Sequence, residues 1–404
     1  MRLSGGLDLT YCTNIHPGNG WEEVSANVRR FAPALKRQLS PGGDFGLGLR
    51  LSAREARELL EGGRLADFRS FLEGEGIYVA LLNGFPHGSF HGAAVKANVY
   101  APDWREEARV DYTLDLIAIL AALLPEEADG GVSTAPLSYK PWMQPAKRGD
   151  WETIVHNLTR VAEALVRVRR DHGKFIHLDI EPEPDCLIED TPETIEFYQA
   201  WLLPAGAPVL AAKLGTSAAE ARELLLDHIQ LCFDCCHFAV EYEDPLAAIG
   251  RFAREGIRVG RVQLSSALEV QFPDDPAQSA EIARRLGPFA DTTYLHQVTE
   301  KRGDRLRRFP DLADALRHAA EPGARQWRIH FHVPLFTKGF GPLGSTQDYV
   351  RTAIEAARRT PFTRHLEIET YTWDVLPDDL KTGLADSIAR EYNWALEAFF
   401  AASI

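Results

Sequence analysis

Strand-like and helix-like segments alternate along almost the whole chain, and this alternation constrains the fold more than any other feature. Apolar residues spaced two apart predict nine strands, at 8–16, 45–52, 77–85, 131–140, 174–182, 229–237, 259–267, 328–336 and 365–373. Amphipathic helices are predicted between them, among them 21–39, 103–124, 150–173, 346–359 and a last helix near 377–402. Repeated strand–helix units predict a parallel sheet, and eight or nine units in 404 residues predict a closed α/β barrel of the (β/α)8 or TIM type.

A single domain covering residues 1–404 is expected, because no Ser- or Gly-rich linker divides the chain. A long insertion is predicted near 268–325, where the strand–helix pattern is least regular. A doubly wound open sheet is the alternative fold. Its dinucleotide-binding version is disfavoured, because no GxGxxG motif lies between a strand and a helix.

Several predicted strands carry polar side chains on one face. In the stretch FIHLDIEPEP (175–184), aliphatic residues alternate with His177, Asp179 and Glu181. A barrel would turn the aliphatic face to the helices and the polar face to the lumen, although most barrels fill the lumen with branched apolar residues. Because buried polar groups need partners, the pattern indicates either a hydrogen-bonded core or a site at the carboxyl ends of the strands. We favour the site.

The residue types at these strand ends suggest metal binding. Carboxylates, neutral imidazoles and an amide oxygen suit a divalent ion such as Mn²⁺, Zn²⁺, Mg²⁺ or Fe²⁺. The candidate ligands are Glu181, Asp234, Gln263, Glu369, His237 and His332. No compact motif such as HExxH is present, so the prediction depends on strands that are far apart in the sequence meeting in space.

Further polar and aromatic residues just past predicted strands are candidates for binding a substrate. Loops rich in Gly and Pro, such as NGFPHGSFHG, allow close approach to a ligand, and cations at strand ends can hold an anion. The candidates are His16, Arg50, His87, His91, Lys140, His296, His330 and Trp373. For several of these residues, each considered singly, a place on an exposed loop without a function is an equally good interpretation.

Composition narrows the classes of protein. The net charge is −14 and no block of Lys and Arg is present, so a nucleic-acid partner is not expected. No signal peptide is predicted, and the most apolar segment, LDLIAILAALLP, is too short and too closely flanked by acids to span a membrane. The five cysteines have no regular spacing, which fits a reducing compartment. These features predict a cytoplasmic protein that acts on a small molecule.

The strand-end residues resemble those of the xylose isomerase-like barrel superfamily, which includes sugar isomerases and epimerases and endonuclease IV-type phosphodiesterases. The shared elements are Glu181 in DIEPEP, Asp-x-x-His at 234–237, His-x-His at 330–332 and the final Glu-Thr at 369–370. The resemblance implies a metal held by the acids and proton transfer by Glu181 and Glu369. The ligand on the seventh strand of that family is usually His, and the matching residue here is Gln263.

Longer motifs resemble the EboE family of bacterial metabolite traffic proteins. They include LTYCTNIHPG, NGFPHGSFHG, STAPLSYKPW, FDCCHFAVEYEDP, HFHVPLF and ETYTWDVLP, spread over nearly the whole chain. This resemblance implies a place in a secondary-metabolite pathway, with proteins of the same operon as possible partners.

These observations leave three hypotheses for the function. The first is a divalent-metal-dependent isomerase or epimerase that acts on a sugar, a cyclitol or a sugar phosphate. The second is a metal-dependent phosphoesterase that acts on a small metabolite. The third is a metabolite-binding or traffic protein without catalytic activity.

Overall fold

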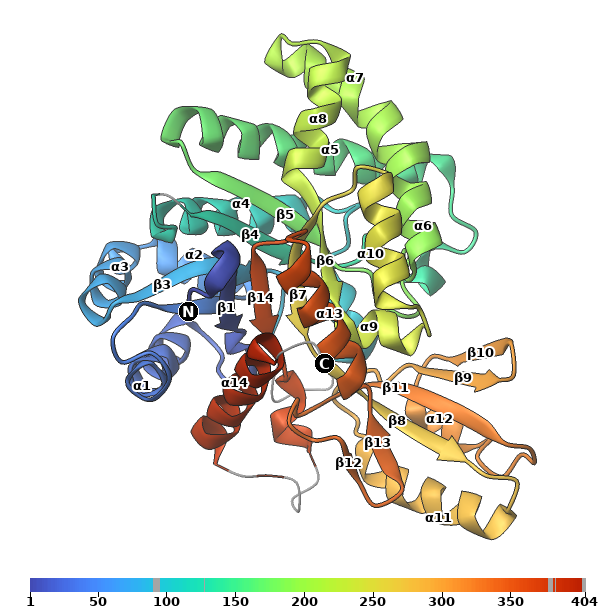
Figure 1. Ribbon diagram of the computed structural model, residues 1–404. Helices are drawn as coiled ribbons and strands as arrows, with labels where there is room; N and C mark the ends of the chain where they lie inside the picture. Colours follow the sequence, from blue (N-terminus) through green and yellow to red (C-terminus); the bar gives the residue numbers. More distant parts are fainter. Residues whose placement is uncertain (90–94, 127, 377–380, 382, 402–404) are drawn as a thin grey trace.

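Eight parallel strands form a nearly closed barrel in the computed structural model, which describes residues 1–89, 95–126, 128–376, 381 and 383–401 (Figure 1). The strands are β1 (Asp8–Tyr11), β2 (Phe45–Arg50), β3 (Ile77–Asn83), β4 (Asp129–Thr134), β5 (Phe175–Ile180), β6 (Ile229–Asp234), β7 (Val259–Leu264) and β14 (His365–Ile368). Their order is β1-β14-β7-β6-β5-β4-β3-β2. A parallel bridge between Cys12 and Gly48 brings the two edges together. The predicted (β/α)8 barrel is confirmed.

Helices cover the outside of the barrel (Figure 1). They are α1 (Trp21–Leu39), α2 (Ala53–Leu60), α3 (Arg64–Glu75), α4 (Glu107–Leu123), α5 (Arg148–His172), α6 (Thr191–Glu196), α7 (Leu203–Leu214), α8 (Ala218–His228), α9 (Cys235–Val240), α10 (Pro245–Arg254), α13 (Gln347–Arg359) and α14 (Leu384–Phe400). The aliphatic face of each strand packs against this layer, as with Ile176, Leu178 and Ile180, which are fully buried. Among the described residues, no helix has the length and apolarity that crossing a membrane requires.

The segment between β7 and α13 in the sequence forms a second sheet, which is antiparallel. It has the order β10-β9-β11-β8-β13-β12 and projects to one side of the barrel (Figure 1). Its strands are β8 (Ser266–Phe272), β9 (Val298–Arg302), β10 (Arg305–Phe309), β11 (Arg325–Val333), β12 (Gly339–Phe340) and β13 (Leu343–Ser345), and it carries α11 (Pro276–Leu286) and α12 (Leu312–Leu316). The predicted insertion is present, and the sheet extends it beyond residue 325.

One strand prediction was wrong in its placement. The segment 328–336 was expected to be a ninth strand of the barrel series, but it belongs to β11 of the antiparallel sheet. Two-residue periodicity identifies a strand without indicating which sheet it joins. The register of β11 against β8 shifts between Ile329 and His332, where the strand reaches the barrel.

A layer of buried ion pairs fills the middle of the barrel lumen. Arg261 on β7 donates to Asp179 Oδ2 (2.9 Å) and to Glu367 Oε2 (3.0 Å), and all three side chains are fully buried. Glycines make room for these acids. A Cβ on Gly48 would lie 1.6 Å from Glu367 Oε1, and one on Gly260 would lie 1.9 Å from Asp179 Oδ1. Part of the polar strand face is therefore an ion-paired core, and it forms the floor below the barrel mouth.

Candidate metal centre

Three carboxylates meet at the carboxyl-terminal mouth of the barrel. Glu181 directly follows β5, Asp234 is the last residue of β6, and Glu369 directly follows β14. One oxygen from each lies within 4.8 Å of an oxygen of the other two. All three residues are buried, with at most 4% of their surface exposed. The barrel thus brings three of the predicted metal ligands together.

The local sequence FDCCH determines how Asp234 is held. Asp234 caps the short helix α9, and its Oδ1 accepts hydrogen bonds from the backbone N–H of His237 (2.9 Å) and from the hydroxyl of Ser265 (2.8 Å). Within the described residues, Asp234 Oδ2 and Glu181 Oε2 are buried without a hydrogen bond. A buried carboxylate oxygen without a partner is costly, and a bound cation would satisfy both oxygens.

The pKa values of the acids reflect their crowding. Burial raises the pKa of Glu181 well above its usual value, and the charge of Asp234 raises it further. Burial, followed by the charges of Glu181 and Asp234, also raises the pKa of Glu369. Burial alone would raise the pKa of Asp234, but His237 and hydrogen bonds to the carboxylate outweigh it, so this pKa is lowered. A divalent ion would neutralise the negative charge collected here.

Three histidines face the acids, and each has its Nδ1 atom anchored on a carbonyl oxygen. The contacts are His237 with Pro182 O (2.9 Å), His332 with Glu369 O (2.9 Å) and His330 with Gln297 Oε1 (2.7 Å). A carbonyl oxygen can only accept, so each Nδ1 carries the hydrogen and each Nε2 presents a lone pair. This is how metal-binding histidines are usually held.

Two of these lone pairs face one another. His237 Nε2 lies 3.1 Å from His330 Nε2. The amide of Gln297 is fixed in orientation, because its nitrogen donates to Pro184 O (3.0 Å), and its oxygen therefore faces His330. The Tyr371 hydroxyl lies 3.3 Å from His330 Nε2 and can donate to it. The pair is suited to a shared cation.

Glu183 lies next to His237 and His330, although the sequence patterns did not identify it as a candidate. A ligand atom from each of Glu183, His237 and His330 lies within 4.8 Å of the other two. Tyr100 donates to Glu183 Oε1 (2.8 Å). Burial raises the pKa of Glu183 to about 7, against the opposing effects of His237 and Tyr100. In the stretch EPEP, Glu183 follows Glu181 by two residues, and this spacing could have identified it as a candidate.

Gln263 lies beside the acids but is engaged elsewhere. It pairs in register with Asp234 on β6 and Glu367 on β14. Its Oε1 accepts from the Cys232 thiol at 3.0 Å. His332 comes from the inserted sheet, and its ligand atom lies within 4.8 Å of those of Asp234 and His237. Its Nε2 is buried without a hydrogen bond among the described residues.

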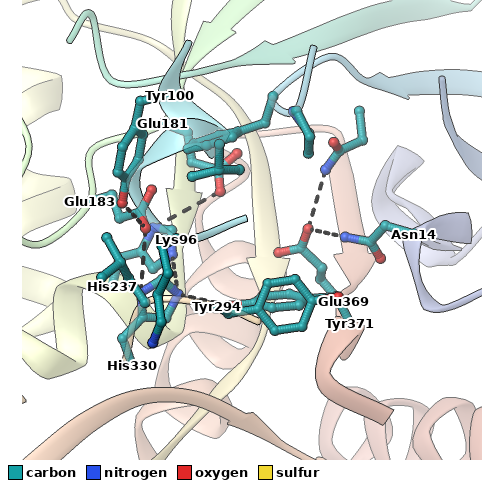
Figure 2. Close-up of a pocket in the computed structure, with 15 residues that line it drawn as sticks. Asn14, Lys96, Tyr100, Glu181, Glu183, His237, Tyr294, His330, Glu369 and Tyr371 are labelled. Atoms are coloured by element: carbon teal, nitrogen blue, oxygen red, sulfur yellow. Dashed lines mark hydrogen bonds and ion pairs between the residues drawn. The ribbon is translucent and has the colours of Figure 1, made fainter. Parts of the chain in front are cut away.

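A pocket of about 520 Å³, part of it open to solvent, lies over these groups. Figure 2 shows Glu181, Glu183, His237 and His330 together on one side, and Asn14 and Glu369 on the other. Asn14 and Asn83 donate to Glu369 Oε1, at 2.8 and 3.2 Å. The remaining walls are mostly apolar or aromatic and are formed by Phe85, Pro86, Val99, Tyr100, Tyr294, Leu295 and Tyr371. Lys96 at the pocket binds Asp311 (2.6 Å).

The predicted substrate-binding residues lie in different places. His330 lines the pocket. His16 and Arg50 line a smaller neighbouring cavity, where Arg50 pairs with Glu55 at 3.0 Å. Lys140 pairs with Glu189 (2.7 Å) and Glu193 (2.9 Å).

Three further candidates, His296, His87 and Trp373, are not among the described residues that line the pocket. His296 supports the strand that carries His330, because its Nδ1 lies 2.9 Å from the His330 carbonyl oxygen. His87 is half-buried against Tyr112, and burial lowers its pKa to about 4. Trp373 is buried, with 7% of its surface exposed. His91 lies outside the described residues.

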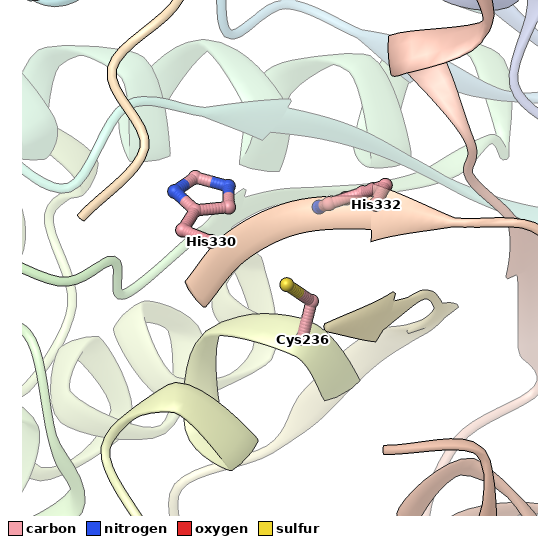
Figure 3. Close-up of side chains that lie close together, drawn as sticks. All are labelled: Cys236, His330 and His332. Carbon is pink, nitrogen blue, oxygen red and sulfur yellow. The ribbon is translucent and has the colours of Figure 1, made fainter. Parts of the chain in front are cut away.

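A cysteine lies close to the histidines. Figure 3 shows Cys236 on α9 next to His330 and His332 on β11, with ligand atoms within 4.8 Å of one another. Burial raises the pKa of this thiol well above its usual value, and nearby acids, first Asp234, raise it further. Because the thiolate is the form that binds metal, Cys236 is less suited to the role than the carboxylates.

No family model matches the chain, and no curated protein matches its sequence. A xylose isomerase-like TIM barrel protein from Mycobacterium smegmatis in complex with magnesium is 12% identical, with a TM-score of 0.51 over 99% of this chain and 98% of that chain. An IolI protein with a bound zinc atom is 11% identical (TM-score 0.48; 97% and 98% covered). A probable 3-DHS dehydratase, AsbF, from Bacillus anthracis is 11% identical (TM-score 0.45; 96% and 98% covered). The chain has the fold of the xylose isomerase-like TIM barrels.

Proposed function

We propose that the protein is a divalent-metal-dependent enzyme that transfers a proton within a small polyhydroxylated metabolite, in the manner of a sugar or cyclitol isomerase or epimerase. The observation that carries the proposal is the convergence of three buried carboxylates, with the Nε2 atoms of three anchored histidines beside them, at the carboxyl-terminal mouth of the barrel. Glu181, Asp234, Glu369 and His332 would hold the ion, and Gln263 would hold it only if its amide oxygen left Cys232.

When bound, a divalent ion polarises a carbonyl oxygen and a neighbouring hydroxyl of the substrate. Glu181 and Glu369 come from β5 and β14, which are separated by two strands in the barrel, so the two carboxylates can flank a substrate. One carboxylate removes the carbon-bound proton next to the carbonyl, leaving an enediolate, and the other returns a proton to carbon. Burial raises the pKa values of both acids, which favours the protonated form that a proton donor needs.

The surrounding residues orient the acids and limit the entry of water. Hydrogen bonds from Asn14 and Asn83 to Oε1 fix the Glu369 carboxylate. The aromatic walls, including Tyr100 and Tyr371, provide flat apolar surfaces that suit the C–H faces of a ring. The pathway, a secondary-metabolite (ebo-type) route in the cytoplasm with partners from the same operon, rests on the resemblance of the long motifs to the EboE family.

The test combines metal analysis with isotope exchange. Protein purified without a tag is analysed by inductively coupled plasma mass spectrometry beside Glu181→Ala and Asp234→Ala. We expect both variants to lose an ion that the wild type binds. Glu391→Gln is the matched control, because Glu391 is also buried but bonds Thr370 and the Leu335 amide instead of lining the pocket, and it should keep the ion.

Exchange of carbon-bound hydrogen for deuterium is then followed by NMR with a panel of sugars, cyclitols and their phosphates in D₂O. Exchange that depends on the metal and disappears in Glu369→Gln would support the isomerase. If the wild type never exchanges hydrogen, and Glu369→Gln binds the same ligand with unchanged affinity, the protein is a carrier. Wild-type protein that takes up no metal would overturn the proposal.

A further inference from the structure

A second group of potential ligands lies at the opposite, amino-terminal end of the barrel. Asp129 is the first residue of β4, His365 is the first residue of β14, and His177 lies on β5. A ligand atom from each is within 4.8 Å of the other two. Strands β5 and β14 are separated by β6 and β7 in the sheet (Figure 1). The two imidazoles therefore approach each other from different parts of the barrel wall. Their ring centroids are 6.0 Å apart.

His177 is held as metal-binding histidines are. Its Nδ1 lies 2.5 Å from Asp179 Oδ1, and Asp179 is fixed in turn by Arg261 Nε at 2.9 Å. A carboxylate that accepts the Nδ1 hydrogen leaves the Nε2 lone pair of His177 available, and it makes that nitrogen a stronger donor to a metal. The buried ion pairs of the lumen therefore orient His177 as a potential ligand on their amino-terminal side.

His365 is the second, independent indication. The residue is 1% exposed, yet within the described part of the chain neither ring nitrogen makes a hydrogen bond. Its Nε2 lies 3.4 Å from Asp129 Oδ1, outside hydrogen-bonding geometry. A buried imidazole that makes no hydrogen bond is destabilising, so packing alone is a poor reason to keep one there.

Asp129 supplies the charge and the route to solvent. Its side chain is 16% exposed. An Asp carboxylate that reaches solvent is ionised at neutral pH. Arg364, whose Nη1 lies 3.6 Å from Asp129 Oδ1, is 60% exposed and can turn away into solvent.

We propose that Asp129, His177 and His365 bind a divalent transition-metal ion at the amino-terminal mouth of the barrel, separate from the candidate metal centre. Two imidazoles and one carboxylate suit Zn²⁺, Co²⁺ or Ni²⁺ better than Mg²⁺ or Ca²⁺, which prefer oxygen ligands. The ion would join β4 and β5 to β14 across the lumen, and its role would be structural. The Arg261 layer lies between the two sites.

The test is a count of bound zinc in four variants. Apo-protein is equilibrated with Zn²⁺, desalted and analysed by inductively coupled plasma mass spectrometry. We expect His365→Gln and Asp129→Asn each to bind one equivalent less than the wild type. Asp234→Asn, in the other mouth, should retain that equivalent. His228→Gln is the matched control, because His228 is buried with its Nδ1 on the Ile176 carbonyl oxygen, and it should bind as much as the wild type.

The same proteins are compared by thermal unfolding with and without Zn²⁺. The ion should raise the Tm of Asp234→Asn by more than it raises the Tm of Asp234→Asn combined with His365→Gln. Asp129→Asn covers the case in which His365→Gln does not fold, since Asp129 lies partly at the surface. Equal zinc content in the wild type, His365→Gln and Asp129→Asn would overturn the proposal, whatever the content of Asp234→Asn.

Discussion

His237 Nε2 and His330 Nε2 lie 3.1 Å apart, although both rings direct their Nδ1 hydrogens to carbonyl-type oxygens. Two lone pairs at this distance repel each other unless a proton or a metal ion lies between them. Burial, followed by the charges of His237 and His332, lowers the pKa of His330 well below its usual value, which favours the neutral form of this ring. A metal ion shared by the two rings would remove this repulsion.

His330→Gln is predicted to separate metal binding from folding. The change removes one of the facing lone pairs, so the apo-variant should be at least as stable as the apo-wild type. The stabilisation produced by added Zn²⁺ should shrink, since a ligand is lost. Chemical denaturation with and without Zn²⁺ measures both effects. An apo-variant destabilised by several kcal/mol, with metal stabilisation unchanged, would make His330 a structural residue.

Asn14→Leu tests the support of Glu369 from outside the ligand set. The Asn14 amide donates to Glu369 Oε1 at 2.8 Å, and its loss leaves Asn83 to hold the carboxylate alone. Residues that orient a ligand typically contribute about 10- to 100-fold in metal affinity. We expect a weakening of that size, measured by isothermal titration with Mn²⁺.

Asn27→Leu is the matched control for this change. Asn27 is an asparagine of α1 that donates to the Pro17 carbonyl oxygen, away from the acids. Its affinity for Mn²⁺ should equal that of the wild type. Equal affinity in Asn14→Leu would mean that Glu369 is not a ligand or that Asn83 alone orients it.

Gly48→Ala should be among the most damaging small changes in the barrel. The new Cβ would meet Glu367 Oε1 at 1.6 Å, and that carboxylate is held by Arg261. Overpacking of a well-filled core costs about 1–3 kcal/mol, and loss of a buried ion pair costs about 3–5 kcal/mol. Gly42→Ala has open space around it and should be nearly neutral. Urea unfolding of both variants checks the difference, and equal midpoints would contradict the packing of this layer.

Periodicity in the sequence was enough to predict the barrel. Alternating apolar residues identified the eight barrel strands, and polar residues at their carboxyl ends identified Glu181, Asp234 and Glu369 as neighbours. The same periodicity misplaced residues 328–336, because an antiparallel strand shows the same alternation as a parallel one. Which sheet a strand joins depends on contacts between distant segments, here those of β11 with β8 and β9.

The parts of the site that sequence patterns could not predict depend on tertiary contacts. Backbone carbonyl groups such as Pro182 O anchor the histidines, and no side-chain pattern reveals them. The engagement of Gln263 by Cys232 likewise depends on the facing of β6 and β7. Asp179 and His177 share the polar strand face with Glu181, but the structure assigns Asp179 to the ion-pair core. Residues of the ion-pair core and residues of the site share this strand face and differ only in how far along the barrel axis they lie.

Glu391 should make the stability of the protein depend on pH. Its side chain is buried, and burial raises its pKa to about 7, although Thr370 and the Leu335 amide donate to it. The folded pKa lies above the unfolded value of about 4.5, so the folded state binds more protons between these values. Its contribution to stability is fully present below about pH 4.5 and is lost as the pH rises to about 7. At about 1.4 kcal/mol per pKa unit, the loss amounts to roughly 3 kcal/mol.

Glu391→Gln keeps the size and the acceptor oxygen of the side chain and removes its titration. The difference in unfolding free energy between the variant and the wild type should therefore shift in favour of the variant by up to roughly 3 kcal/mol between pH 4.5 and pH 7.5. Urea unfolding of both proteins, freed of metal, at several pH values in this range measures the shift. Parallel curves would mean that Glu391 is ionised throughout, and that its hydrogen bonds outweigh the effect of burial on its pKa.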